Sequence, residues 1–389
     1  MKIAILSDFH LGYERFREDA FNQAKEALEK ASSIADALLI PGDIFDSRNP
    51  KPDVIAEGLR LFRDIANKDF GARAIEIEGR GTKFTDKPII AIPGTHERRS
   101  EGVEDPVDLL ALAGLLINAR EARVIIEKGN EKVAIFGIGG ISDERFRDVV
   151  KKIDPKPKEG LFNIFFFHQS VYELLPFNEN FIKMDELPKG FDLYIDGHIH
   201  NRLEYDLNGK KLLIPGSTVL TQLKEKEQEQ KGFYVFDTET KTYSYIYINS
   251  RKFYFIELNV ENKDIEEIYK KINEKDDKSK PIFKFILKGK SKTNLSLSEL
   301  EKRYSNLENA IIEIDKEGEE VNNALSGIRE GNIEGITIRD LQQSIFLEYV
   351  SKMEEFKDFN ISPIELLDIL ENDKKEEAIE ELFEKLRLN

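Results

Sequence analysis

Histidine is rare in this chain, and its few copies occupy similar places. Each comes at or just after the end of a short apolar run: His10, His96, His168, His198 and His200. Carboxylates share this pattern, since Asp8 lies two positions before His10, and Asp43 and Asp46 follow the run ADALLIPG. Histidine nitrogens combined with carboxylate oxygens favour ions such as manganese, iron or zinc over calcium. The residue types therefore indicate metal chemistry.

The apolar runs in front of these residues are typical of buried β-strands. They read KIAILSD, ADALLIPGD, KPIIAIPG, NIFFFH, FDLYIDG and KLLIPGS. Helical spacing between the early runs predicts amphipathic helices over 15–33 and 53–68, and KGFYVFDTETKTYSYIYI predicts a hairpin that ends near residue 250. This alternation predicts an α/β core. In open α/β sheets, loops leaving the carboxyl ends of the strands converge on one crevice, so we expect the histidines and aspartates to meet there.

The local spacing adds to this expectation. Asp8 and His10 are separated by one residue, as are His198 and His200, and in an extended chain such pairs point to the same side. Glycines at 42, 94 and 197 allow tight turns and close approach to an ion or phosphate. The donors exceed the about four to six that one ion needs, so two metals sharing Asp43 as a bridge is the economical arrangement.

Each feature alone has an ordinary explanation. An isolated Asp-x-His or Gly-Asp occurs by chance, and Asp8 alone could cap a helix at Leu11. A lone His168 after three phenylalanines is more often a core residue, and His96 alone could belong to a turn. These explanations require independent coincidences at one sheet edge, so the pattern as a whole favours a metal site.

Composition limits the class of protein. The 389 residues exceed one ordinary domain, and the absence of cysteine excludes disulfides, thiolate zinc sites and cysteine nucleophiles. Acidic residues outnumber basic ones by 74 to 58, which gives a formal net charge of −16. An acidic surface repels nucleic acid unless basic residues gather locally or a partner supplies charge. The opening run is too short for a signal peptide or membrane span, so we expect a cytoplasmic protein with no membrane partner.

The chain divides into four predicted segments. Residues 1–250 hold the motifs. Residues 251–316 alternate strand and helix patterns without chemical residues, as in a small α/β domain, and 317–336 are acidic and glycine-dotted, as in a linker. Residues 337–389 predict two helices, with Thr337 and Ser362 as N-caps. Because these helices have no obvious core of their own, they are expected to bind a partner.

The first 250 residues resemble a known family. The motifs SDFH, GDIFD, GTHE, FFFHQ and GHIH occur in the order of the calcineurin-like metallophosphoesterases, whose motifs are DxH, GDxxD, GNHD/E, H and GHxH. The extension HLGY and the later IPGS resemble the nuclease subunit of the DNA double-strand-break-repair nuclease–ATPase complex, which includes bacterial SbcD-type exonucleases. This resemblance implies a sandwich of two sheets flanked by helices, a small α/β cap domain and a C-terminal helical ATPase-binding segment.

The resemblance also assigns roles to residues. It implies that Asp43 bridges two metals, with one further ligand set made of Asp8, His10 and His200 and the other of His168 and His198. His96 would not be a ligand but would face the scissile phosphate, with Glu97 orienting it. Thr95 stands where the family has an asparagine that binds the second metal, so weaker binding of that metal is expected. Asp46 matches the bacterial exonucleases and is expected beside the ligands.

The implied activity is a manganese-dependent DNA nuclease that acts by two-metal phosphodiester hydrolysis. It would combine double-strand exonuclease and single-strand endonuclease action, use two Mn²⁺ ions or other divalent ions such as Mg²⁺, and bind an SMC-like coiled-coil ATPase through 337–389. The leucine-rich run EDPVDLLALAGLLINA predicts a homodimer through 53–68 and 105–119. Two alternatives stay open: a phosphomonoesterase or cyclic-nucleotide phosphodiesterase, and an ATPase-binding scaffold whose metal site Thr95 weakens.

Overall fold

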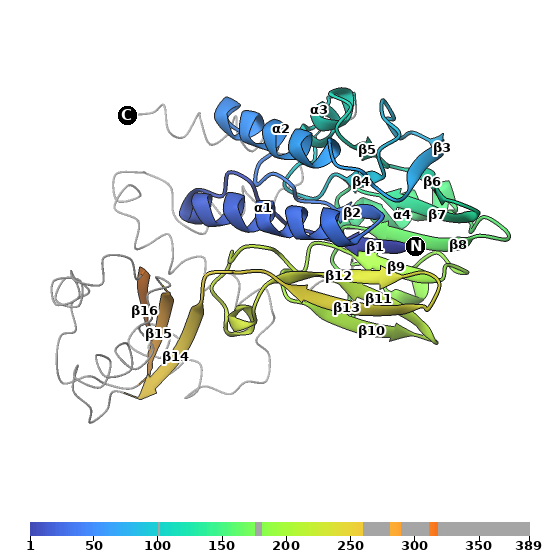
Figure 1. The fold of residues 1–389 in the computed structure, drawn as a ribbon. Helices are drawn as coiled ribbons and strands as arrows, with labels where there is room; N and C mark the ends of the chain where they lie inside the picture. Colours follow the sequence, from blue (N-terminus) through green and yellow to red (C-terminus); the bar gives the residue numbers. More distant parts are fainter. Residues whose placement is uncertain (100–101, 176–180, 260–280, 289–310, 318–389) are drawn as a thin grey trace, which may run out of the picture. The chain divides into compact units, whose positions relative to one another are not determined.

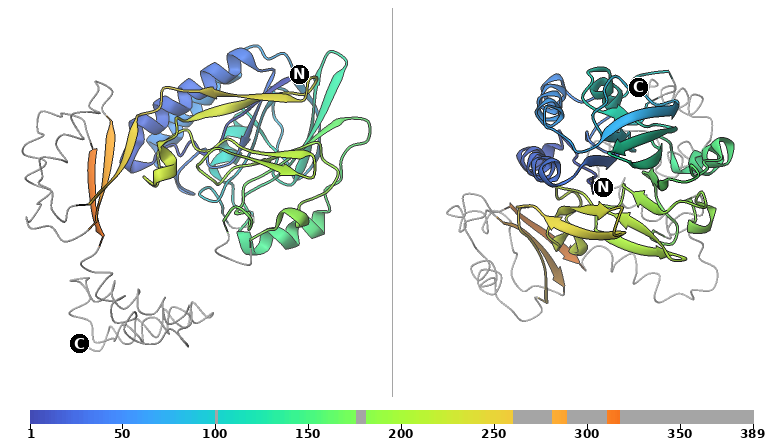
Figure 2. Two further views of the ribbon diagram at one scale, coloured as in Figure 1. Left: turned by 90° about the horizontal axis from the view of Figure 1, so that it is seen from below. Right: turned by 45° about the vertical axis from the view of Figure 1, so that its right-hand side comes forward.

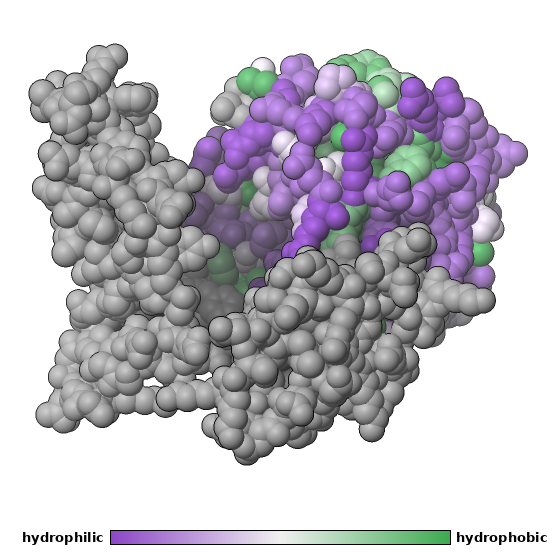
Figure 3. Space-filling model, turned by 90° about the vertical axis from the view of Figure 1, so that its left-hand side faces the viewer, coloured by the Kyte–Doolittle hydropathy of each residue, from purple (hydrophilic) through white to green (hydrophobic). Residues whose placement is uncertain are grey.

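The computed structural model describes residues 1–99, 102–175, 181–259, 281–288 and 311–317. Most of them, Met1–Ile256, lie in one compact unit. Figure 1 shows this unit as two β-sheets with helices on the outside, which is the predicted α/β class. Among the described helices, none combines the length and apolar character needed to cross a membrane. The described residues on the face drawn in Figure 3 are mostly hydrophilic, in keeping with a chain in which 34% of residues are charged.

The first sheet carries most of the motif loops. Its six strands have the order β13-β12-β1-β2-β4-β5, with bounds β1 Lys2–Ile5, β2 Ala37–Pro41, β4 Ile89–Ile92, β5 Ile117–Asn118, β12 Gly232–Asp237 and β13 Thr242–Tyr247. Strands β1, β2, β4 and β5 run parallel, so their carboxyl ends lie at one edge. Strands β12 and β13 form the predicted antiparallel hairpin beside β1.

The second sheet supplies the remaining histidine loops. Its seven strands have the order β10-β11-β9-β8-β7-β6-β3, with bounds β3 Arg73–Gly79, β6 Ala122–Lys128, β7 Glu131–Ile138, β8 Phe162–Phe167, β9 Leu193–Asp196, β10 Leu203–Leu207 and β11 Lys210–Ile214. Strands β7, β8, β9 and β11 are parallel. The sequence patterns had predicted β8, β9 and β11 but not β3, β6, β7 or β10.

Hydrophobic cores hold four layers together. Helices α1 Arg17–Ile34, α2 Pro52–Ala66 and α3 Pro106–Leu112 cover the outer face of the first sheet, and α4 Asp143–Ile153 covers that of the second (Figure 2). Between the sheets, side chains such as Ile5, Ile90 and Phe166 are buried together. The short helices η1 Glu14–Phe16, η2 Met184–Glu186 and η3 Glu225–Gln228 lie in loops. This packing fixes both sheets, and hence the loops at their ends, in one arrangement.

Helix bounds agree well with the sequence patterns. The helices predicted over 15–33 and 53–68 correspond to α1 and α2. Asp105 caps α3, as its position before Pro106 suggests, because its carboxylate accepts hydrogen bonds from the amides of Val107 and Asp108. The helix ends at Leu112, however, and the following residues lead into β5 instead of prolonging the helix.

The segment after residue 250 is described only in part. Its three strands, β14 Phe253–Asn259, β15 Ile282–Lys288 and β16 Ile311–Glu317, form a separate sheet in that order. They coincide with the strand patterns found between 253 and 315. The helices expected between them lie outside the described residues, as do the helical segment 337–389 and all of the linker 317–336 except Glu317. The domain boundaries therefore stay predictions.

Candidate metal centre

All the histidines lie in loops that follow the carboxyl ends of strands. The loop after β1 carries Asp8 and His10, that after β4 carries His96, that after β8 begins with His168, and that after β9 carries His198 and His200. The loop after β2 carries Asp43 and Asp46. The structure thus brings the predicted residues from both sheets to one place.

The backbone of these loops adopts rare conformations. Asp8, His10, Asp43 and His198 all have positive φ, at 54°, 48°, 50° and 65°. Residues other than glycine adopt this left-handed region rarely, and strain of this kind gathers at functional sites. The sequence argument had assumed that Asp8 and His10 share a side because the chain stays extended. That reason was wrong, since β1 ends at Ile5 and left-handed turns aim the two side chains.

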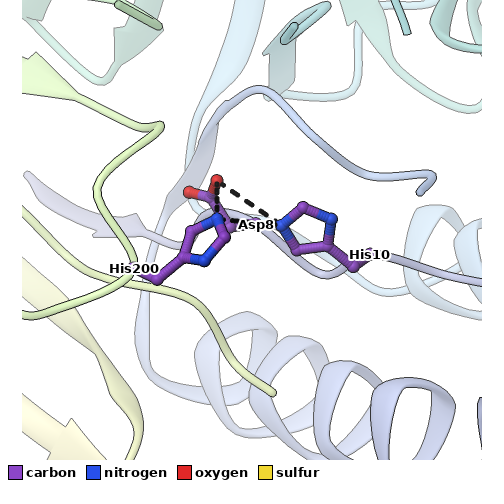
Figure 4. A group of neighbouring side chains, drawn as sticks. All are labelled: Asp8, His10 and His200. Atoms are coloured by element: carbon purple, nitrogen blue, oxygen red, sulfur yellow. Dashed lines mark hydrogen bonds and ion pairs between the residues drawn. The ribbon is translucent and has the colours of Figure 1, made fainter. Parts of the chain in front are cut away.

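One group of donors consists of Asp8, His10 and His200 (Figure 4). The Nε2 atoms of His10 and His200 lie 3.2 Å apart. Asp8 Oδ1 lies 3.8 Å from His10 Nε2 and 3.6 Å from His200 Nε2. These three side chains therefore direct two nitrogens and a carboxylate oxygen toward a common point, as a metal site requires.

A second group shares Asp8 and adds Asp43 and His168. His168 Nε2 lies 3.1 Å from Asp43 Oδ2, while its Nδ1 lies 2.6 Å from the carbonyl oxygen of Pro41. A carbonyl only accepts, so Nδ1 carries a proton and donates it. His198 stacks edge-on to His168 at 5.3 Å between ring centroids, and its Nε2 lies 2.9 Å from the hydroxyl of Ser170. His198 thus lies directly beside His168 of this group.

Orphaned polar atoms test whether these residues fit metal ions. Both carboxylate oxygens of Asp8 are buried without a hydrogen-bond partner. Such atoms are rare in folded proteins and call for an ion or a water. Because these oxygens lie beside the nitrogens of His10 and His200, the donor set suits divalent ions of the manganese, iron or zinc type. The residues present therefore fit the metal that the motifs predict.

Charge distribution within the site favours ionised carboxylate at Asp43. Burial alone would raise the pKa of Asp43, but the adjacent His168 outweighs burial and lowers it. Conversely, burial alone would lower the pKa of His168, whereas Asp43 raises it to about 10. Burial, with the charge of His168 adding, lowers the pKa of His198 to about 4, and burial with His10 lowers that of His200 well below its usual value. His198 and His200 are thus neutral imidazoles, the form that binds metals.

His96 lies beside the ligand groups and is 45% exposed. Its backbone amide donates to Asp43 Oδ1 at 2.9 Å, and its Nδ1 lies 2.9 Å from the carbonyl oxygen of Asp46. Among the described residues, its other nitrogen, Nε2, makes no hydrogen bond. The neighbouring Thr95 hydroxyl lies 3.4 Å from Asp43 Oδ2, so it contacts the carboxylate expected to bridge the metals.

Glu97 connects two loops of the site. It is fully buried, and its carboxylate accepts hydrogen bonds from the amides of Phe45 and Gly94, both at 2.9 Å. It therefore joins the loops after β2 and β4, whereas the backbone of Asp46 orients His96. Burial, together with nearby Asp43, raises the pKa of Glu97 to about 8. Its hydrogen bonds among the described residues are to these amides, and its role in orienting His96 stays a prediction.

Asp46 contacts a predicted ligand directly. Its Oδ1 lies 3.0 Å from Nδ1 of His10. A carboxylate accepts the Nδ1 proton, which leaves Nε2 of His10 with its lone pair toward Asp8 and His200. The structure thus places Asp46 in contact with His10, and the role of Asp46 beside bound metals stays a prediction. Ser170 and Thr221, which bond His198 and His200, were not expected; Thr221 lies 21 residues from His200, and nothing in the local sequence links them.

The fold and this histidine–aspartate site define the class of protein. Residues 1–202, more than half of the chain, match the family of calcineurin-like phosphoesterases, and the chain belongs to that family. It is accordingly a hydrolase of phosphate esters, and the family implies divalent metal ions.

Within the family, the chain is similar to proteins named DNA double-strand break repair protein Mre11. It is 27% identical to that of Sulfurisphaera tokodaii over 77% of each chain. It is 25% identical to that of Sulfolobus acidocaldarius over 92% of this chain and 96% of the relative. Double-strand break repair protein MRE11 of Coprinopsis cinerea is 26% identical over 58% of this chain but only 38% of its own length. The archaeal relatives are therefore matched over most of their length and the fungal one over a minor part.

Proposed function

We propose that this protein is a manganese-dependent DNA nuclease of double-strand-break repair, with double-strand exonuclease and single-strand endonuclease action. The observation that carries the proposal is the pair of donor groups that share Asp8 where loops from both sheets meet. The similarity to Mre11 proteins from archaea supports DNA as the substrate. Metal-dependent phosphodiester hydrolysis is the reaction to which such a site is suited.

Two divalent ions, Mn²⁺ or alternatively Mg²⁺, are part of the proposal. Asp8, His10 and His200 would hold one ion, His168 and His198 the other, and Asp43 would bridge them. Bound ions of this kind act as Lewis acids on a phosphate and make water nucleophilic near neutral pH. Thr95 Oγ1 is a weak candidate ligand because its hydroxyl donates to Asp43 Oδ2 at 3.4 Å.

His96 would hold the proton for the leaving sugar oxygen. Because the Asp46 carbonyl accepts from Nδ1, this nitrogen keeps its hydrogen, and a second proton on Nε2 makes an imidazolium. The Asp46 carboxylate lies 3.6 Å from Nδ1. Nε2 of this partly exposed side chain can then donate its proton to the leaving oxygen, which is general acid catalysis.

A coiled-coil ATPase of the SMC type is the proposed partner, bound through 337–389. The net charge of −16 supports a partner that supplies DNA affinity. Two cations that follow the motif loops form ion pairs within the protein, Arg17 with Asp53 at 2.7 Å and Lys51 with Glu14 at 2.7 Å. Their charges are therefore partly neutralised before DNA binds. Deletion of 317–389 should abolish ATPase binding and spare cleavage of short DNA, and retained binding would contradict the assignment.

A homodimer through 53–68 and 105–119 is proposed as well. Leu109 and Leu112 of α3 support it, because they are 39% and 52% exposed although they belong to a leucine-rich run. Light scattering at micromolar concentration should give twice the chain mass. A monomer would refute this part of the proposal. The cell compartment proposed for the complex is the cytoplasm.

Cleavage of end-labelled double- and single-stranded DNA tests the nuclease function. The natural protein and His96→Ser are compared with manganese, magnesium or a chelator, with Thr240→Val, a change in the turn after β12, as control. We expect manganese-dependent cleavage that His96→Ser reduces by about 10²–10⁴-fold. Activity on small phosphate esters alone would favour a phosphatase, and inactivity on every substrate would favour a scaffold weakened at Thr95.

A further inference from the structure

The ring of His200 is held from behind by a relay of polar side chains. Its Nδ1 hydrogen bonds Thr221 Oγ1, and that oxygen lies 3.2 Å from Glu227 Oε1. A hydroxyl has one hydrogen, and a carboxylate only accepts, so Thr221 donates to Glu227. The Thr221 oxygen must then accept from His200, which places the hydrogen on Nδ1. Nε2, the nitrogen that faces His10 and Asp8, is left with its lone pair.

Glu227 is itself fixed in place. It is 3% exposed, and its carboxylate accepts from the amides of Thr221 at 3.2 Å and Gln222 at 2.8 Å. The ammonium of Lys231, a residue 5% exposed, lies 3.4 Å from the same carboxylate. Burial would raise the pKa of Glu227, but Lys231 and these amides lower it, so the group is an acceptor at neutral pH.

Lys231 connects this network back to His200. Besides Glu227, its ammonium donates to the carbonyl oxygen of His200 at 3.1 Å and to Ser217 Oγ at 3.1 Å. All the donor capacity of the ammonium is thus used inside the protein. The network therefore makes two hydrogen bonds to His200, one between the ring and Thr221 and one from Lys231 to the backbone carbonyl.

Stability alone does not account for such a buried ion pair. Desolvation of two charges offsets much of their attraction, and well-packed apolar residues are often at least as stabilising. A network in which every partner is satisfied instead fixes one arrangement. The arrangement fixed here is that of a residue in the first donor group, so the network acts on the site rather than on the core.

We infer that Thr221, Glu227 and Lys231 are positioning residues, here called the His200 clamp, which set the tautomer of His200 and thereby the metal affinity of the group containing Asp8 and His10. The inference rests on the proposed function, because it concerns the same metal centre. Removal of a partner behind a ligating histidine weakens metal binding by about 10–100-fold in general. The clamp should therefore be visible in metal affinity and, without any metal, in the tautomer itself.

The test uses the full chain with Thr221→Val, which removes the hydroxyl at nearly constant shape. Thr221→Ser keeps the hydroxyl, and Thr240→Val makes the same change far from the clamp. Nitrogen-15 NMR of the histidine rings in metal-free protein at pH 8 reads the tautomer; the five histidines allow assignment by substitution. Calorimetric titration with Mn²⁺ reads affinity. We expect Thr221→Val to lose the Nδ1–H form of His200 and to bind Mn²⁺ about 10–100-fold more weakly, with both comparison variants close to the natural protein.

Glu227→Gln provides a second route if Thr221→Val does not fold. The new amide can donate to Thr221, which allows the hydroxyl to turn toward Nδ1 and populates the other tautomer. An unchanged tautomer and unchanged Mn²⁺ affinity in the folded variants would overturn the clamp. If the natural protein binds no Mn²⁺, the proposed function fails, whereas the tautomer measurement still decides the clamp's effect on the ring.

Discussion

Gly42 lies where the loop after β2 passes the second donor group, and replacing it with alanine tests the close packing of the site. Its φ is +96°, and an added Cβ would lie 2.5 Å from His168 Nδ1 and 2.8 Å from the Cα of Gly94. Gly160 is a matched control. Its φ is +77°, but a Cβ there would meet nothing within 4 Å.

Two contributions separate the variants. Left-handed backbone costs alanine about 1–2 kcal/mol at either position. Only Gly42→Ala adds overpacking, about 1–3 kcal/mol, and a disturbed His168–Pro41 hydrogen bond, about 1 kcal/mol. The free energy of unfolding should thus fall by about 1–2 kcal/mol for Gly160→Ala and by about 3–6 kcal/mol for Gly42→Ala.

Urea unfolding measures both changes. Far-UV circular dichroism is the suitable probe because the chain has no tryptophan. With equal slopes, the midpoint of Gly42→Ala should lie clearly below that of Gly160→Ala. Coincident midpoints would refute the reasoning, since they would mean that the loop accepts a Cβ against His168 without strain.

Three further predictions concern the same site. Thr95→Asn should lower the manganese concentration for half-maximal cleavage, because the amide oxygen is a better ligand than a hydroxyl; an unchanged dependence contradicts this. Glu97→Ala should lower the free energy of unfolding by about 2–6 kcal/mol, since two buried amides lose their acceptor; a loss under about 1 kcal/mol in urea would show that water replaces the carboxylate. Mn²⁺ at 100 times its dissociation constant should raise the free energy of unfolding by about 2.7 kcal/mol for each site that it fills. Thermal unfolding should show a higher midpoint that a chelator reverses, and an unchanged midpoint would count against binding.

Strands that end in a chemical residue were predictable from sequence. KIAILSD and FDLYIDG combine a buried apolar run with a polar end, and the structure places β1 and β9 there. The hairpin of β6 and β7 was missed although Gly129, with φ +59°, and Asn130 separate two apolar runs in a tight turn. That turn signal, two residues rich in glycine and asparagine, was available in the sequence.

The site was predictable as a set of residue types but not as a set of contacts. The resemblance to the phosphoesterase motifs implied that Asp8, His10 and His200 belong together. It carried no information on Thr221 or Glu227, whose positions depend on how the loop after β11 packs. Glu97 shows the same limit, because only the folded loops reveal that its carboxylate bonds backbone amides rather than the next side chain.

The left-handed residues of the site bear on how this enzyme tolerates change. Glycine or asparagine at positions 8, 10, 43 or 198 would relieve backbone strain of about 1 kcal/mol or more each. A laboratory selection for heat resistance alone should therefore enrich such replacements, and every one of them would remove either a carboxylate charge or an imidazole nitrogen from the site. Stability and phosphoester hydrolysis favour different residues at these positions. Stabilising substitutions in this chain should therefore be made in its helices and on its surface rather than in the loops that follow the strands.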